Sequence, residues 1–100
     1  MISYHYSEER EHRENVIHRI GSGKPVISFI VDRGHKNGAE RHVITDNAII
    51  IIYNARTNKL VTKLIARPNQ IKRYYESVGK TAPQKLLDLA YQHVKAGYNN

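Results

Sequence analysis

The densest group of titratable side chains lies in one expected loop and the start of the strand after it. Seven charged or titratable residues fall there: Asp32, Arg33, His35, Lys36, Glu40, Arg41 and His42. Imidazole titrates near neutral pH and a neighbouring carboxylate can orient its ring, so two histidines and a carboxylate suit general acid–base chemistry. Side chains alternate along a strand, and Glu40 and His42 would therefore share a face of the sheet if the strand begins at Glu40. Gly34 and Gly38 allow the backbone to bring His35 back toward that face.

This cluster supports three interpretations. General acid–base chemistry is the first, and a polar surface loop with two incidental histidines is the second. The third is a divalent metal ion held by His35, Glu40 and His42. These residues lack the i, i+4 helical spacing of a zinc protease, and the chain has no cysteine to complete a site. We therefore predict neither a metal ion nor a cofactor.

A basic segment follows the cluster. Between Asp46 and Glu76 the sequence contains no acidic residue. Lys59, Lys63 and Arg67 are separated by even numbers of positions, so a regular strand would project all three from one face. Arg67 directly precedes a proline, which is a rigid place to hold a guanidinium group against a phosphate. The spacing of these cations is typical of a surface that contacts phosphates.

The whole chain is basic. It has 16 Lys and Arg residues against 9 Asp and Glu, which gives a net charge of +7 and a pI near 9.8. Clustered positive charge attracts polyanions and supplies sequence-independent affinity for nucleic acid. We expect nucleic-acid contacts from eight residues: Arg33, Lys36, Arg41, Lys59, Lys63, Lys72, Arg73 and Tyr74. The tyrosine can stack on bases, but it also shares a helical stripe with Ile71, Tyr75 and Val78 that is typical of core packing.

Hydrophobic periodicity and turn residues predict an α+β fold in a single domain that spans residues 1–100. The expected order is an N-terminal helix, a four-stranded antiparallel β-meander and two C-terminal helices. The ranges are about 7–20 for the first helix, 25–67 for the sheet, and 69–78 and 82–96 for the last two helices. Short turns between successive strands favour the meander over a parallel arrangement.

Three local details of these elements are predicted. Ser7 is expected to cap the first helix, and Thr81 with Gln84 has the spacing of a capping box at the start of the last helix. In the last strand, Leu60 and Leu64 are expected on the core side. Each of these assignments depends on where an element begins and on unbroken alternation within it.

Composition excludes several classes of protein. The absence of cysteine excludes a disulfide framework and a thiolate nucleophile. No apolar run approaches the ~20 residues that span a bilayer, and the first residues lack the basic and then apolar order of a signal peptide. We therefore expect a cytoplasmic protein without membrane contact.

Taken together, the loop histidines, the meander and the basic last strand resemble the barnase–EndoU–colicin–RelE superfold of metal-independent ribonucleases. The resemblance covers roughly residues 25–75 and is carried by three stretches, 32–42, 60–63 and 67–68. The same stretches resemble small proteins of phages and mobile elements. Residues 80–100 depart from the simplest members of the superfold by adding a C-terminal helix.

The resemblance implies an RNA-binding endoribonuclease that acts as a toxin or phage effector. In such an enzyme the ribose 2′-hydroxyl attacks the neighbouring phosphorus. Glu40 or His42 would be the base, His35 the acid, and Arg67 with Lys63 the electrostatic clamp on the phosphoryl oxygens. An acidic inhibitor or antitoxin is the expected protein partner, because a free ribonuclease would damage its host.

Two further functions fit the same sequence. One is a non-catalytic nucleic-acid-binding protein, in which the basic strand contacts phosphates and the histidines have no chemical role. The other is a phage protein-interaction domain that binds a host enzyme. The sequence does not identify the RNA substrate, and it leaves the oligomeric state open, although an exposed edge strand could pair with a second copy.

Overall fold

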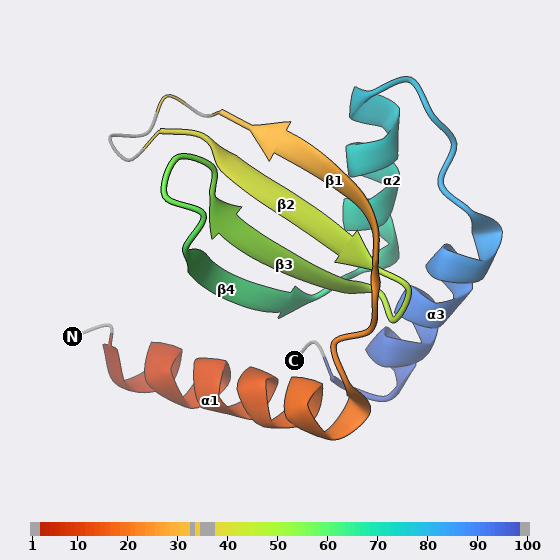
Figure 1. The fold of residues 1–100 in the computed structure, drawn as a ribbon. Coiled ribbons are helices and arrows are strands. Elements are labelled where there is room, and N and C mark those ends of the chain that lie inside the picture. The colour runs from red at the N-terminus through yellow and green to blue at the C-terminus, as the bar shows by residue number, and fades with distance from the viewer. Residues whose placement is uncertain (1–2, 33, 35–37, 99–100) are drawn as a thin grey trace.

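The computed structural model describes residues 3–32, 34 and 38–98, and it confirms the α+β architecture. A single four-stranded antiparallel sheet is preceded by one helix and followed by two (Figure 1). The elements are α1 (Ser3–Ile20), β1 (Pro25–Val31), β2 (Glu40–Thr45), β3 (Ile49–Asn54), β4 (Leu60–Ile65), α2 (Pro68–Ser77) and α3 (Gln84–Lys95). The strands lie in the order β1-β2-β3-β4, so each strand pairs with its neighbour in the sequence, as in the predicted meander.

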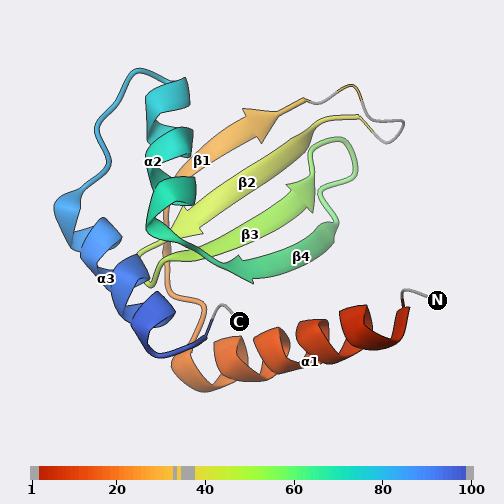
Figure 2. The same ribbon diagram turned by 180° about the vertical axis from the view of Figure 1, so that it is seen from behind.

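One face of the sheet is covered by α2 and α3. Their buried side chains pack on alternate residues of the strands and form the larger core cluster: Phe29, Ile44, Ala48, Ile50, Ile52, Ala66, Ile71, Tyr75, Leu86 and Ala90. The recurrence of apolar residues in both helices matches the 3.6-residue period, so each helix presents one apolar stripe to the sheet. Figure 2 shows both helices in front of this face.

The other face of the sheet packs against α1, which lies beside the β4 edge in both ribbon views (Figures 1 and 2). Val16 and Ile17 of α1 form the second core cluster with four residues of the strands: Val43, Ile49, Ile51 and Ile65. The two clusters alternate along β3, where every side chain from Ile49 to Ile52 is buried. β3 is therefore a central strand that is covered on both faces.

Both predicted helix caps are wrong. The first helix begins at Ser3, so Ser7 lies inside it and is not its N-cap residue. The last helix begins at Gln84 with Pro83 as its N-cap in an extended conformation, so Thr81 lies outside the helix. Proline disfavours helical geometry in the residue before it, which explains why the helix does not start two residues earlier.

A β-bulge changes which side chains face the core in β4. Ile52 pairs with Thr62, but Tyr53 pairs with Leu60, so Val61 is an extra residue in the ladder. Leu60 was expected on the core side, and instead it is 54% exposed on the face of Tyr53. Strict alternation fails across a bulge. The alternation argument that predicted a shared face for Lys59 and Lys63 therefore does not apply, because Lys59 precedes β4 and the bulge lies between the two lysines.

The segment between α1 and β1 is fixed to the β2–β3 turn. Gly23 has a φ of +82°, and a Cβ atom on it would lie 2.5 Å from Asp46 Oδ1. The N–H of Lys24 donates to the same carboxylate oxygen at 2.8 Å, and the Thr45 hydroxyl donates to the carbonyl of Ser22 at 2.6 Å. These contacts fix the position at which the chain leaves α1. Among the described residues, no helix is both long enough and apolar enough to cross a membrane.

Candidate functional site

A buried histidine joins β2 to α2. His42 Nε2 lies 3.0 Å from Glu40 Oε1, and His42 Nδ1 lies 2.5 Å from the hydroxyl oxygen of Tyr74. We call these three hydrogen-bonded residues the His42 relay. The prediction that Glu40 and His42 share a face is confirmed, because β2 begins at Glu40 and the two side chains touch.

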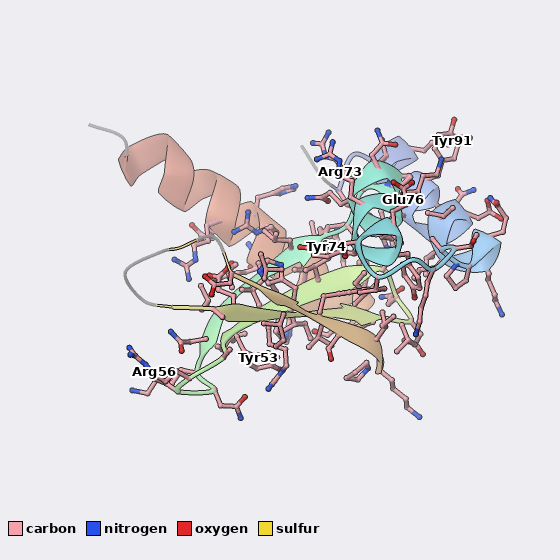
Figure 3. All side chains as sticks on the ribbon, turned by 90° about the horizontal axis from the view of Figure 1, so that it is seen from above. Tyr53, Arg56, Arg73, Tyr74, Glu76 and Tyr91 are labelled. Atoms are coloured by element: carbon pink, nitrogen blue, oxygen red, sulfur yellow. The ribbon has the colours of Figure 1, made fainter. Side chains whose placement is uncertain are left out.

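The sheet register and α2 position the relay. Phe29, His42 and Ile52 are cross-strand partners on the face that α2 covers. Tyr74 extends from α2 toward that face (Figure 3), and its ring stacks on Phe29 with centroids 5.2 Å apart. The ring of Tyr74 therefore packs against the sheet and lies beside the imidazole of His42, with ring centroids 5.5 Å apart, and its hydroxyl reaches Nδ1.

Burial decreases from the middle of the relay toward Glu40. The exposed fraction is 2% for His42 as a residue and 30% for the side chain of Glu40. A buried imidazole requires hydrogen-bond partners for both ring nitrogens, because an unpaired buried polar group is costly. His42 has both partners, and Glu40 connects it to the solvent.

The hydrogen-bond partners assign the tautomer of His42. A carboxylate only accepts hydrogen bonds, so Nε2 carries a proton and donates it to Glu40. In the neutral ring Nδ1 is then the acceptor, and the hydroxyl of Tyr74 donates to it. A proton that leaves the Tyr74 oxygen can move to Nδ1, and the carboxylate of Glu40 stabilises the resulting imidazolium. The arrangement can therefore perform acid–base chemistry at the Tyr74 oxygen.

A surface hollow of about 440 Å³ adjoins Tyr74. Its lining comes from the end of β1, the residue after it, and one side of α2: Phe29, Ile30, Val31, Asp32, Gln70, Arg73, Tyr74 and Ser77. Arg73 is the cation in this lining, and it was predicted to contact nucleic acid. We call this feature the Tyr74 hollow, and its lining combines the cation Arg73, the carboxylate Asp32 and one member of the relay, Tyr74.

The structure does not bring the two residues of the predicted clamp to the relay. Lys63 pairs with Ile51 on the opposite face from His42, and its Nζ donates to Ser22 Oγ at 3.1 Å. Arg67 is the N-cap of α2, next to Ala66, whose N–H donates to the carbonyl of Ala48. Ala48 precedes β3 and is four residues from Ile52, the partner of His42, so the backbone at Arg67 lies near the opposite end of β3, about 13 Å along the strand.

The remaining predicted contacts are divided between surfaces. The Arg41 guanidinium lies 4.7 Å from the ring centroid of Tyr53, on the face opposite the relay, as Figure 3 shows for Tyr53. Lys59 and Lys72 are exposed. Arg33, His35 and Lys36 lie outside the described residues, so the predicted acid has no position here.

The hydrogen bonds of two side chains were not predicted from the sequence. Tyr74 was expected to stack on bases or pack in the core, and its hydrogen bond to a residue 32 positions away has no local signal. His93 belongs to none of the predicted sites, yet it is 6% exposed and its Nε2 donates to the carbonyl of Asn47 at 2.8 Å. The apolar stripe on its helix could have indicated that His93 is buried.

Within the described part of the chain, no group of three or more His, Cys, Asp and Glu residues is placed to hold a metal ion. Comparisons with protein-family models, with curated proteins and with solved structures found no match. The function must therefore be inferred from the site itself.

Proposed function

We propose that this protein binds RNA and cleaves it without a metal ion, with the His42 relay as its acid–base group. The observation that supports this proposal is the hydrogen-bonded series from Glu40 through His42 to Tyr74. An imidazole held between a carboxylate and a hydroxyl is the usual arrangement for activating that hydroxyl. The adjoining hollow and its arginine supply a place for a phosphate.

The proposed reaction begins with a proton transfer. Tyr74 gives its proton to His42 Nδ1, and the tyrosinate oxygen takes the proton of the ribose 2′-hydroxyl. The 2′-oxygen attacks phosphorus, the bond from phosphorus to the 5′-oxygen breaks, and an acid protonates that oxygen; His35 remains the residue proposed for this role. Arg73 stabilises the charge on the phosphoryl oxygens. The products are a 2′,3′-cyclic phosphate and a 5′-hydroxyl end.

The charge of the chain suits the same proposal. Positive residues on both faces of the sheet would contact RNA phosphates beyond the cleavage site, which adds affinity without sequence preference. An acidic inhibitor protein is the partner we propose for a ribonuclease of net charge +7, since complementary charge accelerates association. We also propose that the protein acts in the cytoplasm.

Conservative variants test the relay. Total RNA is incubated with the protein in EDTA, and cleavage is compared for the unaltered chain, Tyr74→Phe and Glu40→Gln. We expect each variant to reduce the cleavage rate roughly 10²–10⁴-fold. Tyr91→Phe is the matched control, because Tyr91 is 55% exposed on α3 and outside the Tyr74 hollow. Thermal unfolding of each variant separates loss of catalysis from loss of folding.

Two results would contradict the proposed mechanism. Cleavage of an all-deoxy substrate would exclude attack by the 2′-hydroxyl. Cleavage at the full rate by a folded Tyr74→Phe variant would exclude the relay as the acid–base group.

A non-catalytic RNA-binding protein is the second candidate. It is favoured by the position of Lys63, which lies on the face opposite the relay, and by the burial of His42, which would equally suit a structural hydrogen bond between β2 and α2. Intact RNA in EDTA, together with salt-sensitive RNA binding, would select this function over the ribonuclease.

A further inference from the structure

A second hollow of about 530 Å³ lies between α1 and β4, away from the Tyr74 hollow. Its lining comes from one side of α1, the residues just after α1, and the first half of β4. The residues that matter for its chemistry are Arg10, Glu14, His18, Ser22 and Lys63. We call this feature the α1–β4 groove.

The groove carries positive charge that the described part of the chain does not neutralise. Glu14 pairs with Arg10 at 3.3 Å, so the one carboxylate in the lining is already engaged. The half-buried Lys63 has a hydroxyl partner, Ser22 Oγ, and forms no ion pair with any described carboxylate. Because a hydroxyl group is neutral, it does not cancel the positive charge of the Lys63 ammonium group, which can still attract an anion.

The carbonyl groups at the end of α1 already have donors from the chain itself. The last carbonyls of a helix carry partial negative charge and would favour a nearby cation. Here the N–H of Gly21 donates to the carbonyl of Ile17 at 2.8 Å, and Asn47 Nδ2 donates to the carbonyls of Ile20 and Gly21. Donors of the chain therefore occupy the carbonyl oxygens of Ile17, Ile20 and Gly21.

A buried donor lies at the wall of the groove. Arg13 Nη2 donates to Thr62 Oγ1, a lining residue, at 3.4 Å. Arg13 Nε is buried and has no hydrogen-bond partner among the described residues. A buried unpaired donor on a charged group is costly, and an added anion in the groove would reduce that cost electrostatically.

We propose that the α1–β4 groove binds a phosphate group, with Lys63 and Ser22 as direct donors and Arg10, Arg13 and His18 as the surrounding donors and cations. The groove is larger than one phosphate, so a sugar–phosphate unit of single-stranded RNA fits its size. This assignment rests on the proposed RNA binding. It adds a site for backbone phosphate on the edge of the sheet, separate from the site of cleavage.

The test measures binding without cleavage. A 2′-O-methyl RNA oligomer lacks the attacking hydroxyl, so its affinity can be measured by fluorescence anisotropy over a range of salt concentrations. We expect Lys63→Met to weaken binding about tenfold and to lower the salt slope by about 0.7, the contribution of one phosphate contact on a single strand. Arg10→Gln, on the exposed side of α1, should also weaken RNA binding.

Lys80→Met is the matched control, because Lys80 is an exposed lysine outside the groove. We expect it to change the affinity no more than about twofold, as removal of one distant charge should. Backbone amide shifts are followed in parallel by nuclear magnetic resonance, first with the RNA oligomer and then with inorganic phosphate. Shifts at residues 21–22 and 60–63 report on the groove directly.

The outcomes are distinguishable. Selective weakening by Lys63→Met, with groove amides shifted by RNA, supports the site. Tight RNA binding that Lys63→Met and Lys80→Met affect equally, without groove shifts, overturns the site and leaves RNA binding intact. No RNA binding, with groove shifts by inorganic phosphate, supports a phosphate site and removes the RNA proposal. No groove shift with either ligand overturns the site.

Discussion

His42 differs from most buried side chains in this protein because its ring has two nitrogen atoms, Nδ1 and Nε2, and each requires a hydrogen-bond partner. Its two hydrogen bonds reach different elements, since Glu40 belongs to β2 and Tyr74 belongs to α2. A leucine of similar size would fill this position without requiring two partners. Buried polar groups are stabilising only when every member is satisfied, and the relay meets that condition.

Residue-level prediction succeeded where it depended on one strand. Alternation along β2 was enough to place Glu40 and His42 on one face. The third member could not be found this way, because the position of Tyr74 depends on how α2 packs on the sheet. Its apolar stripe correctly indicated an inward-facing ring, and nothing in the local sequence indicates which polar atom its hydroxyl meets.

Tyr75 gives a pH dependence that can be measured. Burial raises the pKa of the Tyr75 hydroxyl above its ordinary value, because desolvation disfavours the tyrosinate. The unfolded chain therefore ionises at lower pH than the folded chain. The stabilising contribution is complete below about pH 10, the ordinary value for tyrosine, and is lost as the pH rises further toward the folded pKa.

We expect Tyr75→Phe to abolish this part of the alkaline destabilisation. Urea unfolding of both proteins at pH 8 and pH 11 measures it, as the change in unfolding free energy between the two pH values. The unaltered chain should lose more stability than Tyr75→Phe over this interval. Equal losses would show that burial of the hydroxyl does not affect its ionisation.

At the scale of elements, the order and type of every helix and strand followed from hydrophobic period and turn residues. The errors were local. Alternation was extended through Val61, where the bulge interrupts the β3–β4 pairing, and this reversed the expected position of Leu60. The bulge cannot be found in this stretch of sequence, because its cause is the pairing of β4 with β3 and not the composition of β4.

The connection between α1 and β1 allows a matched pair of variants. Gly21 and Gly23 both have positive φ, +87° and +82°, and differ in surroundings. A Cβ at Gly21 meets no atom within 4 Å, whereas at Gly23 it would approach Asp46 and the backbone nitrogen of Asn47. Both alanine variants carry the backbone cost of positive φ, about 1–2 kcal/mol, and only Gly23→Ala adds a clash.

We expect Gly23→Ala to reduce the free energy of unfolding by about 3 kcal/mol or more, against about 1 kcal/mol for Gly21→Ala. Urea denaturation of the two variants side by side checks the difference. Equal destabilisation would mean that the β2–β3 turn yields to the added methyl group, and that this connection does not fix α1.

For the whole molecule, the sheet separates the proposed chemistry from part of the positive charge. The relay and the Tyr74 hollow lie on the α2 side, and Arg41 with Lys63 lies on the other. Net charge and its distribution along the sequence could be read directly, and alternation along β2 places Arg41 on the face opposite His42. The face of Lys63 relative to the relay depends on how β4 pairs with β3.

The C-terminal helix, α3, forms part of the main core. Leu86 and Ala90 are buried in the larger cluster, and His93 donates to the β2–β3 turn. A chain ending at Lys80 would expose the apolar surface that α3 covers. We expect this truncation to lose cooperative thermal unfolding, monitored by circular dichroism. A cooperative transition in the truncated chain would show that α3 is dispensable for folding.

The meander also determines how the chain reaches its native state. Each strand pairs with the next one along the sequence, so the sheet closes only short loops, whereas contacts of α1 with β4 and of Phe29 with Tyr74 span long separations. Loop-closure entropy favours the local pairings as the nucleus. We expect Ile50→Val to slow refolding and Val16→Ala chiefly to accelerate unfolding, which stopped-flow chevron plots would resolve.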